Sequence, residues 1–190
     1  MIRAFVAIPV PDEVTSVLTA LQAGLPCGRP VPPENFHITL AFLGKHPEPL
    51  IEDVHSALDG IRQSGLDLKI EGLGVFGEER PRALFAKVVL APELASLRKK
   101  VRQAARSAGV ELSSQRFVPH VTLARFGTGA TPSEAADLQS FMAKRMGLAK
   151  ASFWSFSFAL YESHLRSEAP IYEALAEYPL SPSAHLSIGS

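Results

Sequence analysis

The chain has 190 residues, 46% of them hydrophobic, which is enough for one domain, or two small lobes, around a sizeable core. Lys+Arg and Asp+Glu both number 19, so there is no globally basic surface for gripping long nucleic acid. A single cysteine, Cys27, excludes an internal disulfide and a cysteine-based zinc site. Because no apolar run is long enough to span a membrane and the start lacks a signal-peptide pattern, we expect a soluble, cytoplasmic protein.

The spacing of apolar residues predicts strands that alternate with four helices. Clean alternation over residues 66–72 leaves one face in water, which favours antiparallel pairing. Residues 24–34 and 72–81 are predicted loops, and Thr131-Pro132-Ser133-Glu134 has the pattern of a capping box. In chain order the predicted elements are strand 2–8, helix 12–23, strand 37–44, helix 49–63, strand 66–72, strand 83–90, helix 93–108, strand 118–126, helix 131–146, strand 152–161 and a last strand within 168–178.

One eight-residue phrase occurs twice in the chain. His37-Ile38-Thr39-Leu40-Ala41-Phe42-Leu43-Gly44 returns as His120-Val121-Thr122-Leu123-Ala124-Arg125-Phe126-Gly127, with five of the eight positions identical. Because side chains alternate along a strand, the His and Thr of each phrase point to the same face, about 6–7 Å apart at the backbone. Two such phrases facing each other would place two imidazoles and two hydroxyls around one pocket.

The repeated phrase also indicates a duplicated architecture. We predict an α+β fold that is bilobal, with two pseudo-symmetric, mainly antiparallel sheets, flanking helices and a central cleft. Residues 1–180 would form this single domain, and residues 181–190 a frayed tail. Alternation within residues 152–161 predicts a strand with its large apolar side chains on one face, namely Trp154, Phe156, Phe158 and Leu160.

Two histidines near one pocket are suited to general acid–base catalysis. An ordinary histidine pKa of about 6.5 lets one imidazole hold a proton while the other lacks one. An in-line displacement at phosphorus needs such a pair, with a base on the attacking water and an acid on the leaving oxygen. Threonine hydroxyls can donate hydrogen bonds to the non-bridging oxygens, whose charge rises in the transition state. This reaction needs no metal and no other cofactor.

Two other interpretations of the histidines are weaker. A lone histidine in a strand is usually structural, but a repeated His-x-Thr-Leu-Ala favours a function for His37 and His120. A zinc site is disfavoured because neither phrase contains a third His or a carboxylate. Cys27 lies in a loop without a nearby base and is predicted to be inert. The remaining histidines, which have no repeated context, are treated as incidental; they are His46, His55, His164 and His185.

The paired phrases resemble the two-histidine (2H) phosphoesterase superfamily, whose mark is two His-x-Thr-x motifs. Within it the chain is similar to the RNA 2′,3′-cyclic phosphodiesterase branch, once called 2′-5′ RNA ligases. The similarity covers about residues 1–180. The supporting segments are Arg3-Ala4-Phe5-Val6-Ala7, Pro33-Glu34-Asn35-Phe36 before the first phrase, Arg116-Phe117-Val118-Pro119 before the second phrase, and Leu160-Tyr161-Glu162-Ser163.

The resemblance implies metal-independent hydrolysis of 2′,3′-cyclic phosphate at an RNA end, leaving a 2′-phosphate. It implies His37 as the general acid on the 3′ leaving oxygen and His120 as the general base on water, although the near-symmetric repeat leaves the assignment open. Thr39 and Thr122 would hold the phosphate. The implied partner is an RNA end carrying the cyclic phosphate, with small cyclic nucleotides as the alternative. Separately, we expect a monomer that does not bind membranes. Reverse 2′-5′ ligation is an expected side activity.

Two further positions match residues of the resembled family. Arg125 matches an arginine that contacts phosphate, but strict alternation puts it on the face opposite His120, so this role needs a bulge or strand end near Ala124. The other interpretation is a surface charge at a strand end. Phe42 occupies the same slot of the first phrase and matches an aromatic residue that can stack on a base, with core packing as the alternative.

Other functions remain open at this point. The predicted helix near residue 100 carries Arg98, Lys99, Lys100, Arg102 and Arg106. Such a run is usually a solvated face, and it could also guide an RNA strand toward the cleft. The chain could be a non-catalytic RNA- or nucleotide-binding module of the same fold, although the intact phrases argue against this. It could also be a phosphodiesterase acting on small cyclic nucleotides.

Overall fold

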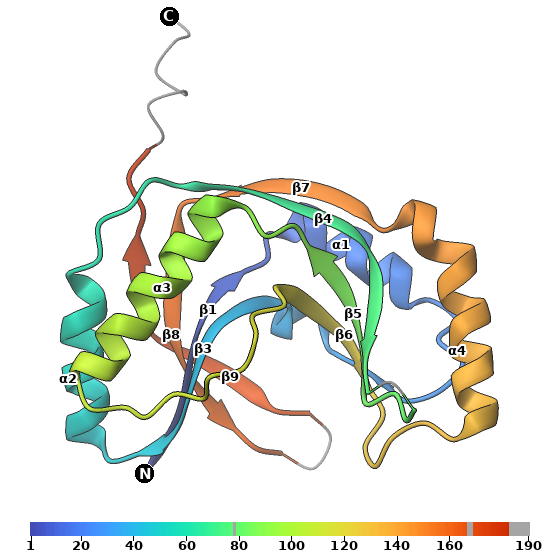
Figure 1. The fold of residues 1–190 in the computed structure, drawn as a ribbon, viewed down its shortest axis with the longest axis horizontal. Helices are drawn as coiled ribbons and strands as arrows, with labels where there is room; N and C mark the ends of the chain where they lie inside the picture. Colours follow the sequence, from blue (N-terminus) through green and yellow to red (C-terminus); the bar gives the residue numbers. More distant parts are fainter. Residues whose placement is uncertain (78, 167–168, 183–190) are drawn as a thin grey trace, which may run out of the picture.

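The structure, a computed structural model, describes residues 1–77, 79–166 and 169–182. Within these residues it contains a mixed arrangement of strands and helices (Figure 1). The strands are β1 (Ile2–Pro9), β2 (Arg29–Pro30), β3 (His37–His46), β4 (Leu66–Phe76), β5 (Ala83–Val88), β6 (His120–Arg125), β7 (Lys150–Ser155), β8 (Ser157–His164) and β9 (Ile171–Pro179). The helices are α1 (Asp12–Gln22), α2 (Glu48–Asp59), α3 (Pro92–Ser107) and α4 (Pro132–Arg145), with short 3₁₀ turns at Pro33–Asn35 and Met146–Leu148.

The named strands form one sheet in the order β7-β4-β5-β6-β3-β1-β8-β9, with β2 paired to β6. All pairings between named strands are antiparallel. Each half of the sheet has four main strands, and β3 and β6 meet at its middle. The predicted α+β class and mainly antiparallel pairing are confirmed. The two sheets expected from the sequence are joined into one, because Ile38 pairs with Val121 across β3 and β6.

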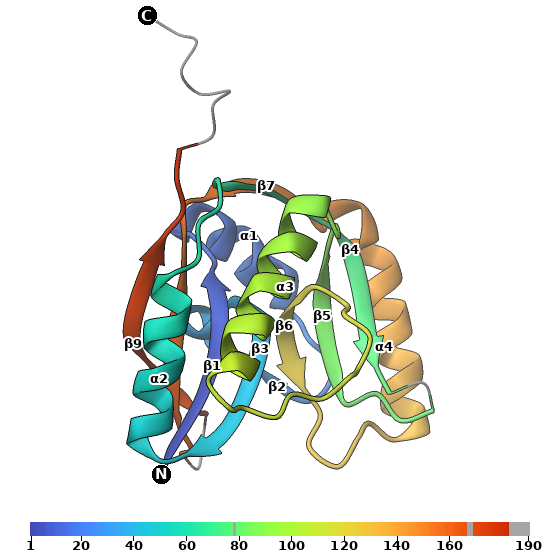
Figure 2. The ribbon, with the colours of Figure 1, turned by 60° about the vertical axis from the view of Figure 1, so that its left-hand side comes forward.

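The helices flank the sheet as amphipathic elements. Helix α3 buries one stripe at helical spacing, consisting of Leu94, Leu97, Val101 and Ala105. Helices α2 and α3 pack side by side, and both contact the half that contains β1 and β3 (Figure 2). Helix α1 contacts β6 and β7 in the other half. Among the described residues, none of the helices combines the length and apolar character needed to cross a membrane.

The capping box expected at the start of α4 is present. Thr131 Oγ1 accepts a hydrogen bond from the Glu134 amide at 3.3 Å, and a Glu134 carboxylate oxygen accepts one from the Thr131 amide at 2.8 Å. These two bonds satisfy amide groups that a helix N-terminus otherwise leaves without partners. The predicted start of this helix is therefore confirmed.

Several of the predicted boundaries were wrong. Helix α2 ends at Asp59, whereas the helix was predicted to reach residue 63, and the short strand β2 lies within the loop predicted over residues 24–34. Strand β4 continues to Phe76, through the segment predicted as a loop over residues 72–81, because Gly72 adopts φ 87° at a register shift and the pairing with β5 resumes beyond it. The predicted strand 152–161 is two strands, β7 and β8, that break at Phe156. Most of the tail predicted to fray, residues 183–190, lies outside the described residues.

The break at Phe156 has a topological cause. Strand β7 pairs with β4 at one edge of the sheet, whereas β8 pairs with β1 in the other half, so the chain crosses between halves at this point. The side chains therefore do not share one face as predicted. Trp154 and Phe156 are 42% and 44% exposed, whereas Phe158 and Leu160 are buried.

Candidate active site

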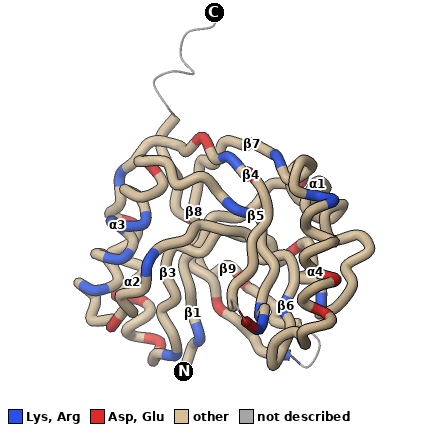
Figure 3. The backbone as a smooth tube through the Cα atoms, turned by 45° about the vertical axis from the view of Figure 1, so that its right-hand side comes forward, with Lys and Arg blue, Asp and Glu red and all other residues tan. Residues whose placement is uncertain are grey.

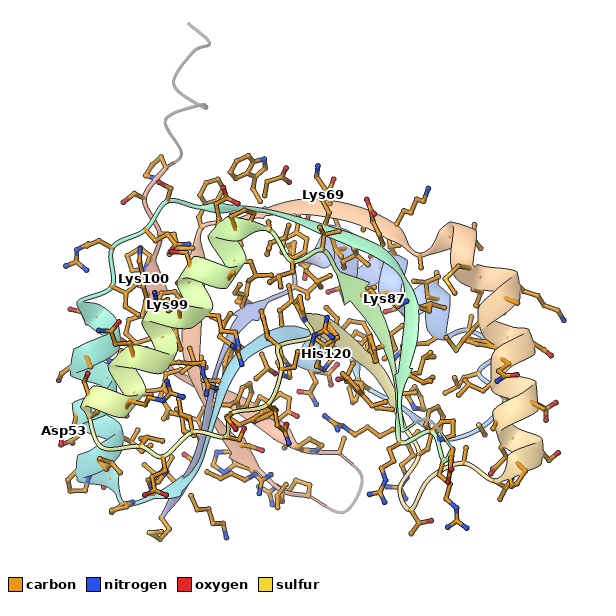
Figure 4. All side chains as sticks on the ribbon, in the orientation of Figure 1. Asp53, Lys69, Lys87, Lys99, Lys100 and His120 are labelled. Carbon is orange, nitrogen blue, oxygen red and sulfur yellow. The ribbon has the colours of Figure 1, made fainter. Side chains whose placement is uncertain are left out.

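The two repeated phrases form the neighbouring central strands, β3 and β6. Ile38 pairs with Val121 in antiparallel register, and both side chains are fully buried on the core face. Extending that register by one residue in each direction sets His37 opposite Thr122 and Thr39 opposite His120. Each histidine therefore lies beside the threonine of the other phrase. Figure 4 shows the labelled His120 near the middle of the molecule, where the two halves meet.

This crossed arrangement separates the two imidazoles along a diagonal. Paired strands lie about 4.8 Å apart and residues at i and i+2 are about 6.7 Å apart, so the two histidine Cα atoms are about 8 Å apart in a regular ladder. The threonines occupy the other diagonal. The two histidines and the two threonines thus occupy the four corners of a rectangle around the Ile38–Val121 pair. A phosphate centred over this rectangle would meet an imidazole at two opposite corners and a hydroxyl at the other two.

Both phrases contain a β-bulge just after the threonine. In β6 the partner of Leu84 is Ala124 and the partner of Phe85 is Thr122, which leaves Leu123 as the extra residue. Leu123 and Ala124 are consequently buried in succession, and the next side chain returns to the histidine face. The bulge that a phosphate-contacting Arg125 would require is therefore present.

The first phrase has the same irregularity. The partner of Val6 is Ala41 and the partner of Ala7 is Thr39, so Leu40 is the extra residue in β3. Leu40 and Ala41 are both buried, and Phe42 then emerges on the histidine face with 66% of its surface exposed. This exposure excludes core packing as the role of Phe42. The backbone irregularity is thus repeated along with the sequence.

A cavity of about 380 Å³ covers this face of the sheet. The structure brings all six residues singled out from the sequence together in its lining: His37, Thr39, Phe42, His120, Thr122 and Arg125. The described lining also contains arginine, serine and glutamine side chains but no carboxylate or thiol. Two imidazoles, hydroxyls and guanidinium groups form a set suited to an anion.

A backbone carbonyl orients each imidazole. His37 Nδ1 lies 2.7 Å from the carbonyl oxygen of Asn35, and His120 Nδ1 lies 2.7 Å from that of Val118. A carbonyl oxygen can only accept a hydrogen bond, so Nδ1 carries the proton and donates in both rings. Nε2 is therefore the atom of each ring that remains for chemistry in the cavity. The side-chain amide of Asn35 in turn donates to the Pro170 carbonyl at 2.8 Å, which anchors the first of these turns.

Aromatic rings surround His37. The ring centroid of Phe5 lies 4.9 Å from that of His37, and Tyr172 meets the imidazole edge-on at 5.3 Å. Burial among these groups is the largest cause that lowers the pKa of His37, and the positive charge of Arg125 and the nearby His120 act in the same direction. The Asn35 hydrogen bond opposes them, and the net result is a pKa of about 4. His37 is therefore neutral at neutral pH in the free protein.

His120 has an equivalent environment in the other half. Its ring lies 4.8 Å from Phe76 in an edge-on arrangement and 5.2 Å from Phe85. Burial lowers the pKa of His120, the Val118 hydrogen bond opposes this effect, and Arg125 adds to it. Arg125 thus faces both imidazoles and acts on both through its charge.

Sequence reasoning missed the aromatic residues around the imidazoles. Phe76 falls within the segment predicted as a loop, and Tyr172 lies in the last strand without any repeated context. No local pattern could identify Tyr172, because it reaches His37 only through the pairing of β9 with β8 and of β8 with β1. Phe85 lies in an apolar strand that the sequence predicts, but its proximity to His120 follows only from the pairing of β5 with β6, in which Lys87 is the register partner of His120.

The other singled-out residues lie elsewhere. His46 and His55 bond to the Leu43 carbonyl and the Tyr178 hydroxyl, and His185 lies outside the described residues. Burial raises the pKa of the Cys27 thiol, which disfavours a reactive thiolate. One trio on β8 and β9 has atoms close enough to share a metal ion, namely Glu162, His164 and Glu173. None of these three lines the two-histidine cavity.

Residues 8–85 and 88–172 match the family model for LigT like phosphoesterases. A protein of Aeropyrum pernix named RNA 2′,3′-cyclic phosphodiesterase is 34% identical over 168 residues, which cover 87% of this chain and 93% of that protein. A Geobacillus stearothermophilus protein of the same name is 31% identical over 183 residues. That match covers 93% of this chain but 56% of the relative, so the chain spans just over half the length of that protein.

Solved structures show the same fold. A structure from Thermus thermophilus superposes with a TM-score of 0.78 at 26% identity, covering 95% of this chain and 98% of the other. The Escherichia coli LigT protein in complex with 3′-AMP gives a TM-score of 0.75 at 25% identity, with 94% and 98% coverage.

Proposed function

Because this chain belongs to the LigT-like phosphoesterase family, we propose that it hydrolyses 2′,3′-cyclic phosphate at RNA ends and leaves a 2′-phosphate. The names of the Aeropyrum and Geobacillus relatives support the cyclic phosphodiesterase activity. The observation that carries the proposal is the crossed register of β3 and β6, which sets His37 and His120 at opposite corners of one cavity.

The geometry supports a single in-line displacement at phosphorus. A water oxygen bonds to the phosphorus, its proton passes to Nε2 of His120, and the bond from phosphorus to the 3′ oxygen breaks. Nε2–H of His37 protonates that leaving oxygen. Each histidine role contributes roughly 10²–10⁴-fold to the rate. Because the repeat is nearly symmetric, the reverse assignment of acid and base has the same geometry.

The remaining residues of the cavity hold the phosphate and the nucleoside. Thr39 and Thr122 donate hydrogen bonds to the non-bridging oxygens, and Arg125 offsets the charge that these oxygens gain in the transition state. Phe42, exposed at the rim, offers its ring to the terminal base. The lining supplies proton transfer and charge stabilisation from side chains alone, which is the basis for proposing a metal-independent reaction.

An anionic substrate also changes the protonation of the two imidazoles. In the free protein both imidazoles are neutral at neutral pH, because burial and Arg125 disfavour their charged forms. A cyclic phosphate between the rings neutralises part of the Arg125 charge and favours a proton on one imidazole. Substrate binding thereby creates the acid that the reaction requires.

The direct test uses a short RNA that ends in a 2′,3′-cyclic phosphate, incubated with excess EDTA. We expect turnover, and a product in which ³¹P NMR places the phosphate on the 2′ hydroxyl. A folded protein that binds this RNA without turnover would instead be a binding module. A 3′-phosphate product would contradict the proposed leaving group, and activity lost in EDTA but restored by zinc would contradict the metal-independent mechanism.

A second candidate is a phosphodiesterase for small cyclic nucleotides. The size of the cavity favours it, because about 380 Å³ is within the range of pockets that enclose small ligands. The same assay with 2′,3′-cyclic AMP in place of RNA separates the two. A value of kcat/KM for the mononucleotide equal to that for the RNA would favour this alternative.

A further inference from the structure

One wall of the two-histidine cavity is strongly basic. Arg98 and Arg102 on α3 line it together with Arg116 and Gln115, which lie in the segment between α3 and β6. Figure 3 shows several Lys and Arg positions along α3. The arginine-rich helix noted in the sequence therefore faces the cavity with at least two of its charges, and it is more than a solvated helix face.

These guanidinium groups lack acidic partners among the described residues. The ion pairs found there involve Lys69 and His164, and none involves Arg98, Arg102 or Arg116. Burial and the neighbouring charges of Arg102 and Arg106 lower the pKa of Arg98. The wall thus holds like charges that repel one another, in a chain whose net charge is zero. A bound anion would relieve this repulsion.

Two of the arginines are held in place by the segment opposite them. The Arg98 guanidinium lies 4.3 Å above the ring centroid of Phe117, and Arg98 Nε is buried without a hydrogen-bond partner among the described residues. Arg102 donates to the Ser113 carbonyl at 2.5 Å. Planar guanidinium groups positioned in this way are suited to binding a phosphate through paired hydrogen bonds.

We propose that Arg98, Arg102 and Arg116 form a subsite for the phosphodiester one nucleotide upstream of the cyclic phosphate. The inference rests on the proposed function. One continuous cavity contains both this wall and the two histidines, so a single RNA end can contact both at once. The preferred substrate is then an oligonucleotide, because a cyclic mononucleotide has no second phosphate to place there.

A neighbouring cavity of about 690 Å³ offers the competing route for the RNA strand. It shares Arg125 and Tyr172 with the two-histidine cavity, and Arg166 also lines it. His37 and His120 do not line it. The path along α3 is favoured because its arginines and the histidines line the same space. An Arg166→Ala variant tests the other path.

The experiment compares kcat/KM for the dinucleotide ApA bearing a 2′,3′-cyclic phosphate with kcat/KM for 2′,3′-cyclic AMP. We expect the wild type to prefer the dinucleotide. In Arg98→Ala and Arg102→Ala we expect the ratio of the two values to fall at least about tenfold, with a weaker dependence of the dinucleotide reaction on salt. Arg98→Lys keeps the charge but loses the paired donors of the planar guanidinium, so it should retain part of the preference for the dinucleotide.

Lys99→Ala is the matched control, because Lys99 is an exposed cation beside Arg98 that does not line the cavity (Figure 4). Its ratio should equal that of the wild type. An equal fall for both substrates in Arg98→Ala, or a fall in Arg166→Ala alone, would overturn the subsite. If the wild type hydrolyses neither substrate, it is the proposed function that fails. Circular dichroism melting of each variant separates a binding defect from a folding defect.

Discussion

The ring of Tyr172 meets the ring of His37 edge-on, with their centroids 5.3 Å apart and their planes at 87°. Tyr172 belongs to β9, at the edge of the sheet, whereas His37 begins β3 near its centre. The tyrosine also meets Phe5 edge-on at 4.8 Å, so it closes the aromatic surroundings of the imidazole. This contact contributes to the burial that keeps His37 neutral.

Removing the Tyr172 ring should therefore raise the pKa of His37. In Tyr172→Ala water reaches the imidazole, the penalty on its charged form falls, and the pKa moves up from about 4 toward the ordinary value. An NMR titration of the histidine Cε1 protons measures this shift. Tyr172→Phe keeps the ring and should keep the low pKa. An unchanged His37 titration in Tyr172→Ala would show that the tyrosine does not shield the imidazole.

The activity should be greatest on the acid side of neutrality. The proposed reaction needs one imidazole protonated and one neutral, and in the free protein both pKa values lie below 6.5. Above the higher of the two, each pH unit removes about nine-tenths of the productive form, and below the lower one both rings are protonated. A plot of kcat/KM against pH should be bell-shaped with its maximum below about 6.5. A maximum above about pH 7, or a flat profile between about pH 5 and 9, would argue against the histidine pair.

Replacing either histidine should lower cyclic-phosphate turnover at least about a hundredfold. Nε2 of each ring is assigned one proton transfer, and the loss of a general acid or base costs roughly 10²–10⁴-fold. Because the two rings serve one step, His37→Ala combined with His120→Ala should lose little more than either single variant. His46→Ala, at a residue outside the cavity, serves as the control. Near-normal kcat in either active-site variant would remove the mechanism.

Phe42→Ala should weaken substrate binding without destabilising the protein. The ring is 66% exposed, so its removal should change the free energy of unfolding by no more than about 0.5 kcal/mol. Loss of base stacking costs about 1–3 kcal/mol, which raises KM roughly 5–150-fold. Chemical denaturation and steady-state kinetics measure the two effects, and Phe42→Trp should preserve KM. An unchanged KM in Phe42→Ala would exclude stacking.

Much of the site could be predicted from the sequence because the residues that carry its chemistry occur in two short, similar segments. The period of two along a strand places His37 with Thr39 and His120 with Thr122, whatever the rest of the fold. The same rule puts Arg125 on the face opposite His120 unless a bulge lies between them. Local pattern could not decide this, because the bulge depends on the register that β5 imposes on β6.

The boundary errors have the same origin. Alternation within residues 152–161 predicted one continuous strand, whereas Phe156 marks the crossing from the β4 edge to β1. Hydrophobic periodicity cannot detect a change of pairing partner, since both strands are built from similar residues. The arginines of α3 pose a comparable problem, because composition alone does not say which helix face meets a cavity.

The sequence by itself determined the reacting groups and the class of fold, because strand and helix periodicity act over a few residues. The tertiary structure decided which histidine lies beside which threonine, and which aromatic rings exclude water from the imidazoles. It also decided that Arg98 and Arg102 line the same cavity as His37 and His120. These relationships depend on the order of strands in the sheet and on the Ile38–Val121 register, which are set by burying the whole core at once.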